Sequence, residues 1–463
     1  MSKLNHDVLY EIFQNLQDLI NMTYTNDPDN LNKMINYKEF LRSQFSCLLV
    51  NKNWCEVMIP FLWSNPFKYA YKAHIKSSLF KIIISHLSDN SIKLLKDENI
   101  IETNFQKLKL SFNYVRFCKY LNDIHYICTK RLLEEEIYKF FISECSSIKS
   151  LNSNMLCYTI LKYPGANISL SNLYELHCIT KDQDFYYGLA QICKSIEKLH
   201  VVNDYEESFG VVKLIEMQTQ IKYVFIDGCY VECKKIIQAL DKHVNSIIHL
   251  EMIEYSTSAI QFFMKKLINL RYLKVYNGYY ILEKYVIYFN YYNLKEIELC
   301  KIFSLDIAIN IIKNTNGNLW KIRIGCAQHY YDKAKEYNQM IHKYCPNIKY
   351  VTVFLNRDGT LEELEKIFIK CQHLEAIDIN EGINYKYIDK FLNLLLELAP
   401  LTLCKIHIYD MSNCFDSDES LKLFLINWGH HKGKKTLHLY SDYTNIIRDI
   451  IHKYDINLKT LII

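Results

Sequence analysis

The amino-acid sequence predicts an α/β solenoid of short repeats, preceded by a small all-helical module. A short apolar motif returns along most of the chain at a nearly constant interval, whereas the first 66 residues have apolar side chains at helical spacing. The motif is an apolar residue, two others, a second apolar residue, one other and a third apolar residue. Its plainest copy, LRYLKV, occupies residues 270–275. We call it the repeat motif.

The repeat motif recurs from the first third of the chain to its end. It begins at Leu173, Ile196, Ile221, Ile247, Leu270, Leu294, Leu319, Ile348, Leu374, Leu403 and Leu458, and in weaker form at Phe105, Ile148 and Lys434. Between Leu173 and Leu403, neighbouring copies start 23 to 29 residues apart. This spacing is typical of solenoids, because one such unit is too small to bury its apolar face and must stack on its neighbours.

Composition and charge narrow the class of protein. The chain has 463 residues, of which 50% are hydrophobic and 23% charged, as in folded proteins. Its 11 Gly and 6 Pro leave no long flexible linker. A net charge of +4 and a pI near 8.2 do not indicate a nucleic-acid-binding or membrane-surface protein. The apolar stretch 391–398 is far shorter than the roughly 20 residues of a membrane span.

The cysteines and the amino-terminal residues indicate a compartment. The polar start of the sequence does not resemble a signal peptide, so we expect the 16 Cys to be reduced thiols in the cytoplasm or nucleus. Four of them lie three residues ahead of a repeat motif, in different repeats: Cys145, Cys193, Cys345 and Cys371. We predict that they are small buried residues that close helices, and that the chain binds no metal and no cofactor.

The helical module is predicted at residues 1–66. A first amphipathic helix covers residues 6–16, with Asn5 or Asp7 as its cap. Residues 21–36 have turn-forming side chains and are predicted to be a loop. A second helical run is predicted from Tyr37 through Trp54, ending near residues 59–63. Residues 67–104 are predicted to be a helical linker that caps the solenoid, which then occupies residues 105–463.

Each repeat is predicted to be a short strand followed by a helix. Side chains alternate along a strand, so Leu270, Leu273 and Val275 should point inward and Tyr272, Lys274 and Tyr276 should lie on the open face. Helical runs such as residues 233–240 separate the strands. A strand and a helix in about 25 residues form the unit of a leucine-rich-repeat horseshoe, with strands on the concave side and helices on the convex side.

Three stretches of the module resemble an F-box. They are DVLYEIFQNL at residues 7–16, SCLLVNKNW at residues 46–54 and PFLW at residues 60–63. The F-box is the helical module by which substrate receptors of cullin-RING ubiquitin ligases dock on the Skp1 adaptor. Together with the repeats, the chain is similar to F-box and leucine-rich-repeat proteins, particularly the fungal F-box-like families. The resemblance implies adaptor binding by Leu4, Val8, Leu9, Ile12, Phe13, Leu16, Leu48, Val50 and Trp54.

A physical argument independent of the resemblance also favours a partner for the module. A domain of about 50 residues buries a small fraction of its surface, so apolar side chains left outside favour a permanent partner. The alternative is that these side chains all pack inward against the first repeat.

The open face of the strands is the candidate substrate-binding surface. It combines charged and aromatic side chains, as protein-binding surfaces do. The predicted contact residues are Tyr223, Phe225, Glu251, Tyr272, Lys274, Tyr276, Glu298, Lys321, Arg323 and Tyr350. The alternative is an ordinary polar face without a partner.

These patterns predict a non-catalytic substrate-recognition subunit of an Skp1-cullin-F-box ubiquitin ligase, whose substrate is an unknown protein. No catalytic motif is present, and a catalytic function would need a tight polar cluster in one pocket. The alternative function is a leucine-rich-repeat scaffold without ligase association. That alternative is supported by Asn5, which stands where the F-box family usually has proline, and by the insertion at residues 21–36.

Overall fold

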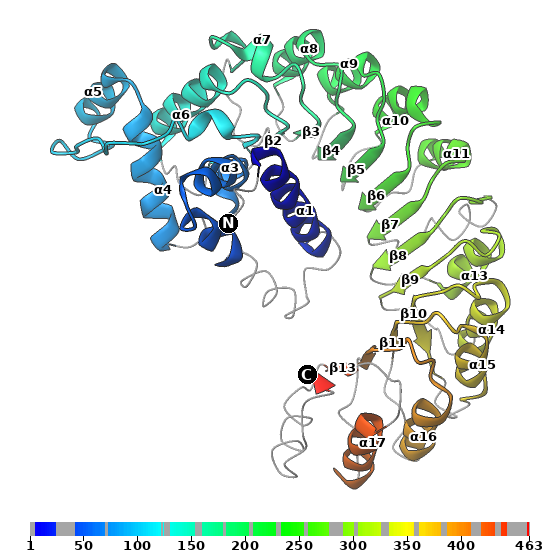
Figure 1. The fold of residues 1–463 in the computed structure, drawn as a ribbon. Helices are drawn as coiled ribbons and strands as arrows, with labels where there is room; N and C mark the ends of the chain where they lie inside the picture. The colour runs from blue at the N-terminus through cyan, green and yellow to red at the C-terminus, as the bar shows by residue number, and fades with distance from the viewer. Residues whose placement is uncertain are drawn as a thin grey trace. The chain divides into compact units, whose positions relative to one another are not determined.

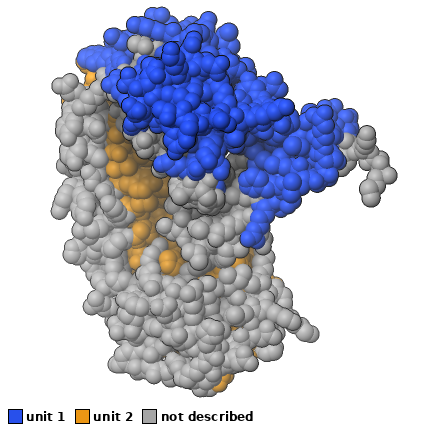
Figure 2. Space-filling model, turned by 90° about the vertical axis from the view of Figure 1, so that its left-hand side faces the viewer, with its two compact units in different colours: residues 1–200, 208–220 blue, residues 201–207, 221–463 orange. Residues whose placement is uncertain are grey.

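A computed structural model describes most of the chain. The described residues are 5–24, 42–69, 73–121, 124, 130–152, 160–178, 182–202, 207–227, 233–253, 258–276, 290–300, 304–325, 333–355, 361–380, 387–408, 418–430, 437–441 and 461–462. They form two compact units (Figure 2), which are described separately. Unit 1 comprises residues 1–200 and 208–220, and unit 2 comprises residues 201–207 and 221–463.

Unit 1 begins with helices α1 (His6–Tyr24) and α3 (Lys52–Trp63), with a further helix at residues 42–48. Helix α1 continues through residues 21–24, which were wrongly predicted to belong to a loop. The predicted second run is broken at residues 49–51, because Asn51 is extended and its side chain accepts a hydrogen bond from the Trp54 N–H as the cap of α3. Leu9, Phe13, Val57 and Met58 form the core between α1 and α3.

The next segment of unit 1 is mainly helical. It contains η1 (Pro66–Tyr69), α4 (Ala73–His86), α5 (Asp89–Asp97) and η2 (Val115–Phe117). The weak repeat motif at Phe105 does not form a strand, because the N–H of Leu108 donates to the Ser85 hydroxyl of α4 rather than to a strand. The first strand is β1 (Tyr120–Leu121), whose Tyr120 N–H donates to the backbone carbonyl of Ser64, just after α3.

The repeats of unit 1 follow β1. Their elements are α6 (Arg131–Glu144), β2 (Ser150–Asn152), η5 (Ile160–Lys162), α7 (Ala166–Ser169), β3 (Glu175–Cys178), α8 (Gln183–Ile192), β4 (Lys198–Val202) and α9 (Phe209–Met217). Strands β1, β2 and β3 pair in parallel, with Leu121, Leu151 and Leu176 in register. The last two residues of β4 are assigned to unit 2.

Unit 2 continues the same alternation. Its elements are β5 (Tyr223–Asp227), α10 (Lys234–Leu240), η6 (Asp241–His243), β6 (His249–Ile253), α11 (Ser258–Lys266), β7 (Tyr272–Tyr276), β8 (Glu296–Cys300), α13 (Leu305–Lys313), β9 (Lys321–Ile324), α14 (Ala334–Tyr344), β10 (Tyr350–Phe354), α15 (Glu362–Lys370), β11 (Ala376–Asn380), α16 (Ile388–Leu398), β12 (Lys405–Ile408), α17 (Asp418–His430), β13 (Leu437–Ser441) and β14 (Leu461–Ile462). All these strands are parallel and pair in chain order, and the helices lie on one side of the sheet (Figure 1).

The repeat motif forms the core, as predicted. Leu270, Leu273 and Val275 are buried, whereas the alternate residues of β7 are partly exposed. Leu273 lies in register with Leu250 of β6 and Ile297 of β8, so equivalent apolar positions stack from strand to strand. This arrangement of parallel strands, returning helices and a stacked core is a leucine-rich-repeat solenoid of the α/β class.

The four cysteines ahead of the repeat motif are buried and close helices, as predicted. Cys145, Cys193, Cys345 and Cys371 are the carboxyl-terminal caps of α6, α8, α14 and α15, and all four are buried. Three of their thiols also donate to a carbonyl of the preceding repeat, at 3.3 Å for Val115, 3.5 Å for Leu173 and 3.6 Å for Cys345. All four cysteines therefore close a helix, and three of them also join their repeat to the previous one.

A second connection between repeats was not predicted. The residue directly before the repeat motif is often Asn, Ser or Thr, and its side chain donates to a backbone carbonyl of the preceding repeat. Examples are Asn269 to the Asn245 carbonyl at 2.8 Å and Asn318 to the Tyr292 carbonyl at 2.6 Å. Ser195, Ser246, Asn293 and Thr402 make equivalent bonds. These side chains satisfy carbonyl groups of the turns between helix and strand.

Among the described residues, no helix combines the length and the apolar character needed to cross a membrane.

Candidate functional site

The candidate site is the strand face of unit 2, which we define as the outward side chains of β5 to β12. The ten side chains predicted to bind substrate all lie on these strands. Nine are partly exposed, and Glu298 is buried, with 3% of its surface accessible. The parallel register places Glu251, Lys274, Glu298 and Arg323 side by side across β6 to β9.

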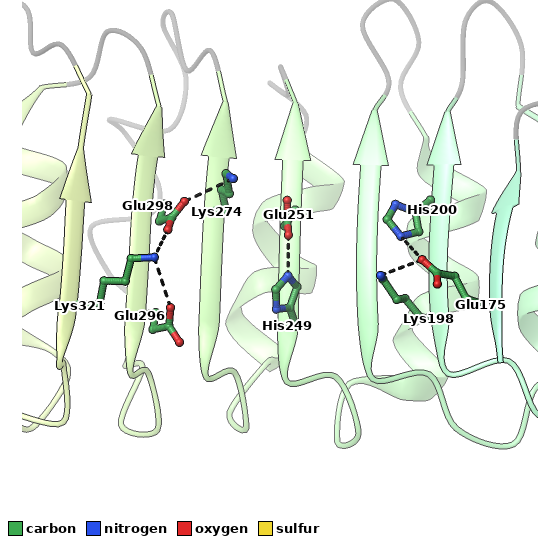
Figure 3. Close-up of polar contacts among 9 residues, drawn as sticks. All are labelled: Glu175, Lys198, His200, His249, Glu251, Lys274, Glu296, Glu298 and Lys321. Carbon is green, nitrogen blue, oxygen red and sulfur yellow. Dashed lines mark hydrogen bonds and ion pairs between the residues drawn. The ribbon is translucent and has the colours of Figure 1, made fainter. Parts of the chain in front are cut away.

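An ionic network crosses β7, β8 and β9 (Figure 3). Lys274 lies 3.4 Å from one carboxylate oxygen of Glu298, and Lys321 contacts the other. Lys321 also lies 3.7 Å from Glu296, which was not predicted as a site residue. The ammonium groups lie over aromatic rings, Lys274 at 4.8 Å from the Tyr276 centroid and Lys321 at 5.8 Å from the Tyr350 centroid.

The network changes the titration of its members. Burial by itself raises the pKa of Glu298, but Lys321 and Lys274 bring that pKa below its ordinary value. Burial lowers the pKa of Lys274, but the Tyr276 hydroxyl and Glu298 raise it by more, so the net shift is upward. Burial raises the pKa of Glu296, and Lys321 offsets only part of this effect. Glu298 and Lys274 are therefore a stable charge pair at neutral pH.

A second cluster covers β5 to β7. The His249 ring stacks on the Tyr272 ring, with centroids 4.0 Å apart and planes at 12°. The Tyr223 ring of β5 has its centroid 5.6 Å from that of His249. His249 Nε2 lies 2.7 Å from Glu251 Oε1. Burial, reinforced by Glu298 and Glu251, raises the pKa of Tyr272 far above its ordinary value, so its hydroxyl stays protonated. The stacking of His249 on Tyr272 and the contact of His249 with Glu251 hold these rings in place on the strand face.

A third contact lies on β10 to β12. The Tyr350 hydroxyl donates to Asp378 Oδ2, and His407 Nδ1 lies 3.9 Å from Asp378 Oδ1. Asp378 is 5% exposed. The strand face thus presents aromatic and charged groups whose positions are set by neighbouring side chains, which suits recognition of another macromolecule.

In the helical module, some of the side chains predicted to bind the adaptor are exposed and others are buried. Val8, Ile12 and Val50 are exposed by 43%, 44% and 54%. Leu9 and Phe13 instead lie in the core of the module, with 0% and 1% exposed, because α3 packs against that face of α1.

The remaining predicted adaptor residues are partly buried or not described. Leu16, Leu48 and Trp54 are half-buried, and Trp54 packs edge-on against Phe13 with centroids 5.6 Å apart. Leu4 lies outside the described residues. Phe45 and Leu49 were not predicted to belong to this surface, although Phe45 is 55% exposed and Leu49 is 87% exposed. Both belong to the apolar run that predicted the second helix, so their apolar character was visible in the sequence.

A separate polar cluster lies in unit 1, on β3 and β4. Glu175 Oε1 lies 3.3 Å from His177 Nε2, 3.2 Å from His200 Nε2 and 2.8 Å from Lys198 Nζ. The two imidazole rings stack, with centroids 4.0 Å apart and planes at 4°.

Comparisons with known proteins give limited similarity. No protein-family model matches this chain, and no curated protein matches it. Among solved structures, the chain is similar to a protein from Bacteroides fragilis, with 16% identity and a TM-score of 0.34 over 54% of this chain and 75% of the other. It is also similar to the leucine-rich repeat-containing protein LegL7 from Legionella pneumophila, with 14% identity and a TM-score of 0.33 over 61% of this chain and 92% of the other.

Proposed function

We propose that this chain is the substrate-recognition subunit of an Skp1-cullin-F-box ubiquitin ligase. In this proposal the helical module of residues 1–66 docks on an Skp1-like adaptor, and the strand face binds a protein substrate. The chain performs no chemistry itself, and its place of action is the cytoplasm or the nucleus. Its contribution is proximity, because holding a substrate lysine near a charged conjugating enzyme makes their encounter effectively intramolecular.

The observation that carries the proposal is the exposed apolar surface of the module. Val8 and Ile12 are four residues apart on α1 and therefore lie on one face of the helix, next to each other. Leu49 and Val50 add exposed apolar area just before α3. A module with so small a core leaves these side chains in water unless a partner covers them, which favours a permanent docking surface.

The strand face supports the substrate half of the proposal. Its aromatic side chains and paired charges are ordered before any partner arrives, which reduces the entropy lost on binding. Tyrosine and arginine are enriched at the energetic centres of protein interfaces. Tyr272 and Tyr276 lie on β7, and Arg323 lies two strands away on β9.

Adaptor docking is tested by co-elution of the purified chain with an Skp1-like adaptor. The double variant Val8→Asp with Ile12→Asp is expected to reduce adaptor affinity at least about tenfold, because it places two charges in an apolar interface. The matched control is Ile369→Asp, an exposed apolar residue of α15 outside the module, with 52% exposed. Equal affinities of wild type and double variant would assign adaptor binding to another surface or to none.

Substrate capture is tested with a charge reversal on the strand face. Lys274→Glu with Arg323→Glu should leave adaptor affinity unchanged and reduce ubiquitylation of co-purified substrate by the reconstituted ligase. Undiminished substrate ubiquitylation by this variant would place substrate binding away from β7 and β9.

A second function, a leucine-rich-repeat scaffold without ligase association, is favoured by one observation. Leu9 and Phe13, two residues of the F-box-like stretch, are used for the core of the module and are not available to an adaptor. A folded wild-type chain that does not co-elute with the adaptor would support this function.

A further inference from the structure

Outward side chains of β3 and β4 converge on one point in unit 1. Glu175 and His177 are two residues apart on β3 and share a face, and His200 occupies the equivalent face of β4. The N–H of Lys198 donates to the Tyr174 carbonyl at 3.0 Å, so the two strands are neighbours. Because neighbouring strands lie about 4.8 Å apart, side chains of successive repeats can reach a common ligand.

The distances within this cluster match those of a metal site. Glu175, His177 and His200 each offer one ligand atom, and these three atoms all lie within 4.8 Å of one another. The Oε1 to Nε2 distances are 3.3 and 3.2 Å. Zinc bonds of about 2.0 to 2.2 Å place neighbouring ligands of a tetrahedron about 3.3 to 3.5 Å apart.

Lys198 and the ring stacking oppose metal binding. Lys198 Nζ lies 2.8 Å from the same Glu175 oxygen and is therefore a competing cation. Its side chain is 38% exposed, so the ammonium can move into water. The lone pairs of the stacked rings lie in two parallel planes, so the rings must rotate out of their stacked arrangement to coordinate one ion.

We propose that Glu175, His177 and His200 bind a zinc-like divalent ion on the strand side of unit 1. Glu175 and His200 appear with Lys198 in Figure 3. Two imidazoles and one carboxylate suit zinc and its cobalt substitute, and three protein ligands leave a fourth position for water. This site is independent of the adaptor and substrate surfaces proposed above.

The test is titration of the chelator-treated full chain with Co²⁺, followed by visible absorption, and with Zn²⁺, followed by calorimetry. The wild type is expected to bind one equivalent with the visible bands of tetrahedral cobalt and without a near-ultraviolet thiolate band. His200→Ala is expected to weaken binding at least about tenfold. The matched control is His249→Ala, because His249 also pairs with a glutamate on a strand but belongs to no such group of three among the described residues.

Lys198→Met provides a variant with the opposite expected effect. Removing the competing ammonium should tighten metal binding, a result that misfolding cannot produce. The proposal is overturned if His200→Ala and His249→Ala change the affinity equally, if a thiolate band accompanies binding, or if Lys198→Met binds no tighter than wild type.

Discussion

Glu298 shows how individual charges are held on the strand face. It is nearly inaccessible to water, yet two lysines, Lys274 and Lys321, contact its carboxylate from the neighbouring strands. A buried carboxylate is tolerated only with such partners, since an isolated one would be neutralised by protonation. Each charged side chain of the network therefore depends on the others to stay ionised while buried.

Glu298→Ala is therefore expected to destabilise the protein by about 1–3 kcal/mol, because it leaves two half-buried lysines without their shared partner. Urea unfolding followed by circular dichroism measures the effect. Glu375→Ala is the matched control, since the Glu375–Lys349 pair spans 3.1 Å with both side chains about half exposed. The control should change stability by no more than about 0.5 kcal/mol. An equal loss of stability in the two variants would contradict the claim that the buried network stabilises the fold more than an exposed ion pair does.

Glu363 gives a prediction about pH. Burial raises its pKa, but Gln339, Lys366 and His342 together lower it to about 2. Because this pKa is lower than that of an unfolded glutamate, about 4.3, the ionised carboxylate stabilises the fold fully above about pH 5 and loses that effect as pH falls toward 2.

Glu363→Gln should consequently destabilise the protein at pH 7 by about 1–3 kcal/mol and by roughly half as much or less at pH 3. Thermal unfolding of both proteins at several pH values provides the comparison. A stability difference that stays constant between pH 7 and pH 3 would show that the charge of Glu363 is not responsible.

At the scale of elements, periodicity was sufficient to predict the strands of the repeats but not the ends of the amino-terminal helices. The strands follow from apolar spacing, because each must bury one face on its neighbours. The break at Asn51 depends on a single side-chain cap, and the absence of a strand at residues 105–110 depends on Ser85, which is 23 residues away from its partner Leu108. Contacts of this kind leave no periodic signal.

The same limit applies to the candidate sites. Glu175 and His200 lie in different repeats, and no metal site was predicted from the sequence. Parallel pairing instead brings outward side chains of successive strands together, as it also does for Lys321 with Glu296 and Glu298. Leu9 and Phe13 were assigned to a partner surface because helical spacing does not say which apolar stripe faces the second helix.

The polar residues before the repeat motif are expected to contribute to stability in each repeat. Asn269→Ala and Asn318→Ala should each lower stability by about 1 kcal/mol, because a carbonyl of the preceding repeat loses its donor. Asn318→Asp is the matched variant, since it keeps the shape but cannot donate, and it should be at least as destabilising as alanine. Wild-type stability of Asn318→Asp in urea unfolding would contradict the role of the side-chain donor.

At the scale of the whole molecule, the proposed function assigns different partners to different parts of the chain. Apolar side chains of α1 and the segment before α3 are assigned to the adaptor, and the ordered polar and aromatic side chains of β5 to β10 to the substrate. The two surfaces differ in chemistry, so substitutions in one should leave binding at the other intact.

The most direct test is amide hydrogen exchange of the full chain with and without a saturating Skp1-like adaptor. The account predicts slower exchange at residues 6–16 and 42–63, and unchanged exchange at strands β5, β6 and β7, which remain available to a substrate. Unchanged exchange in the module, or protection confined to the strands, would contradict adaptor docking on this module.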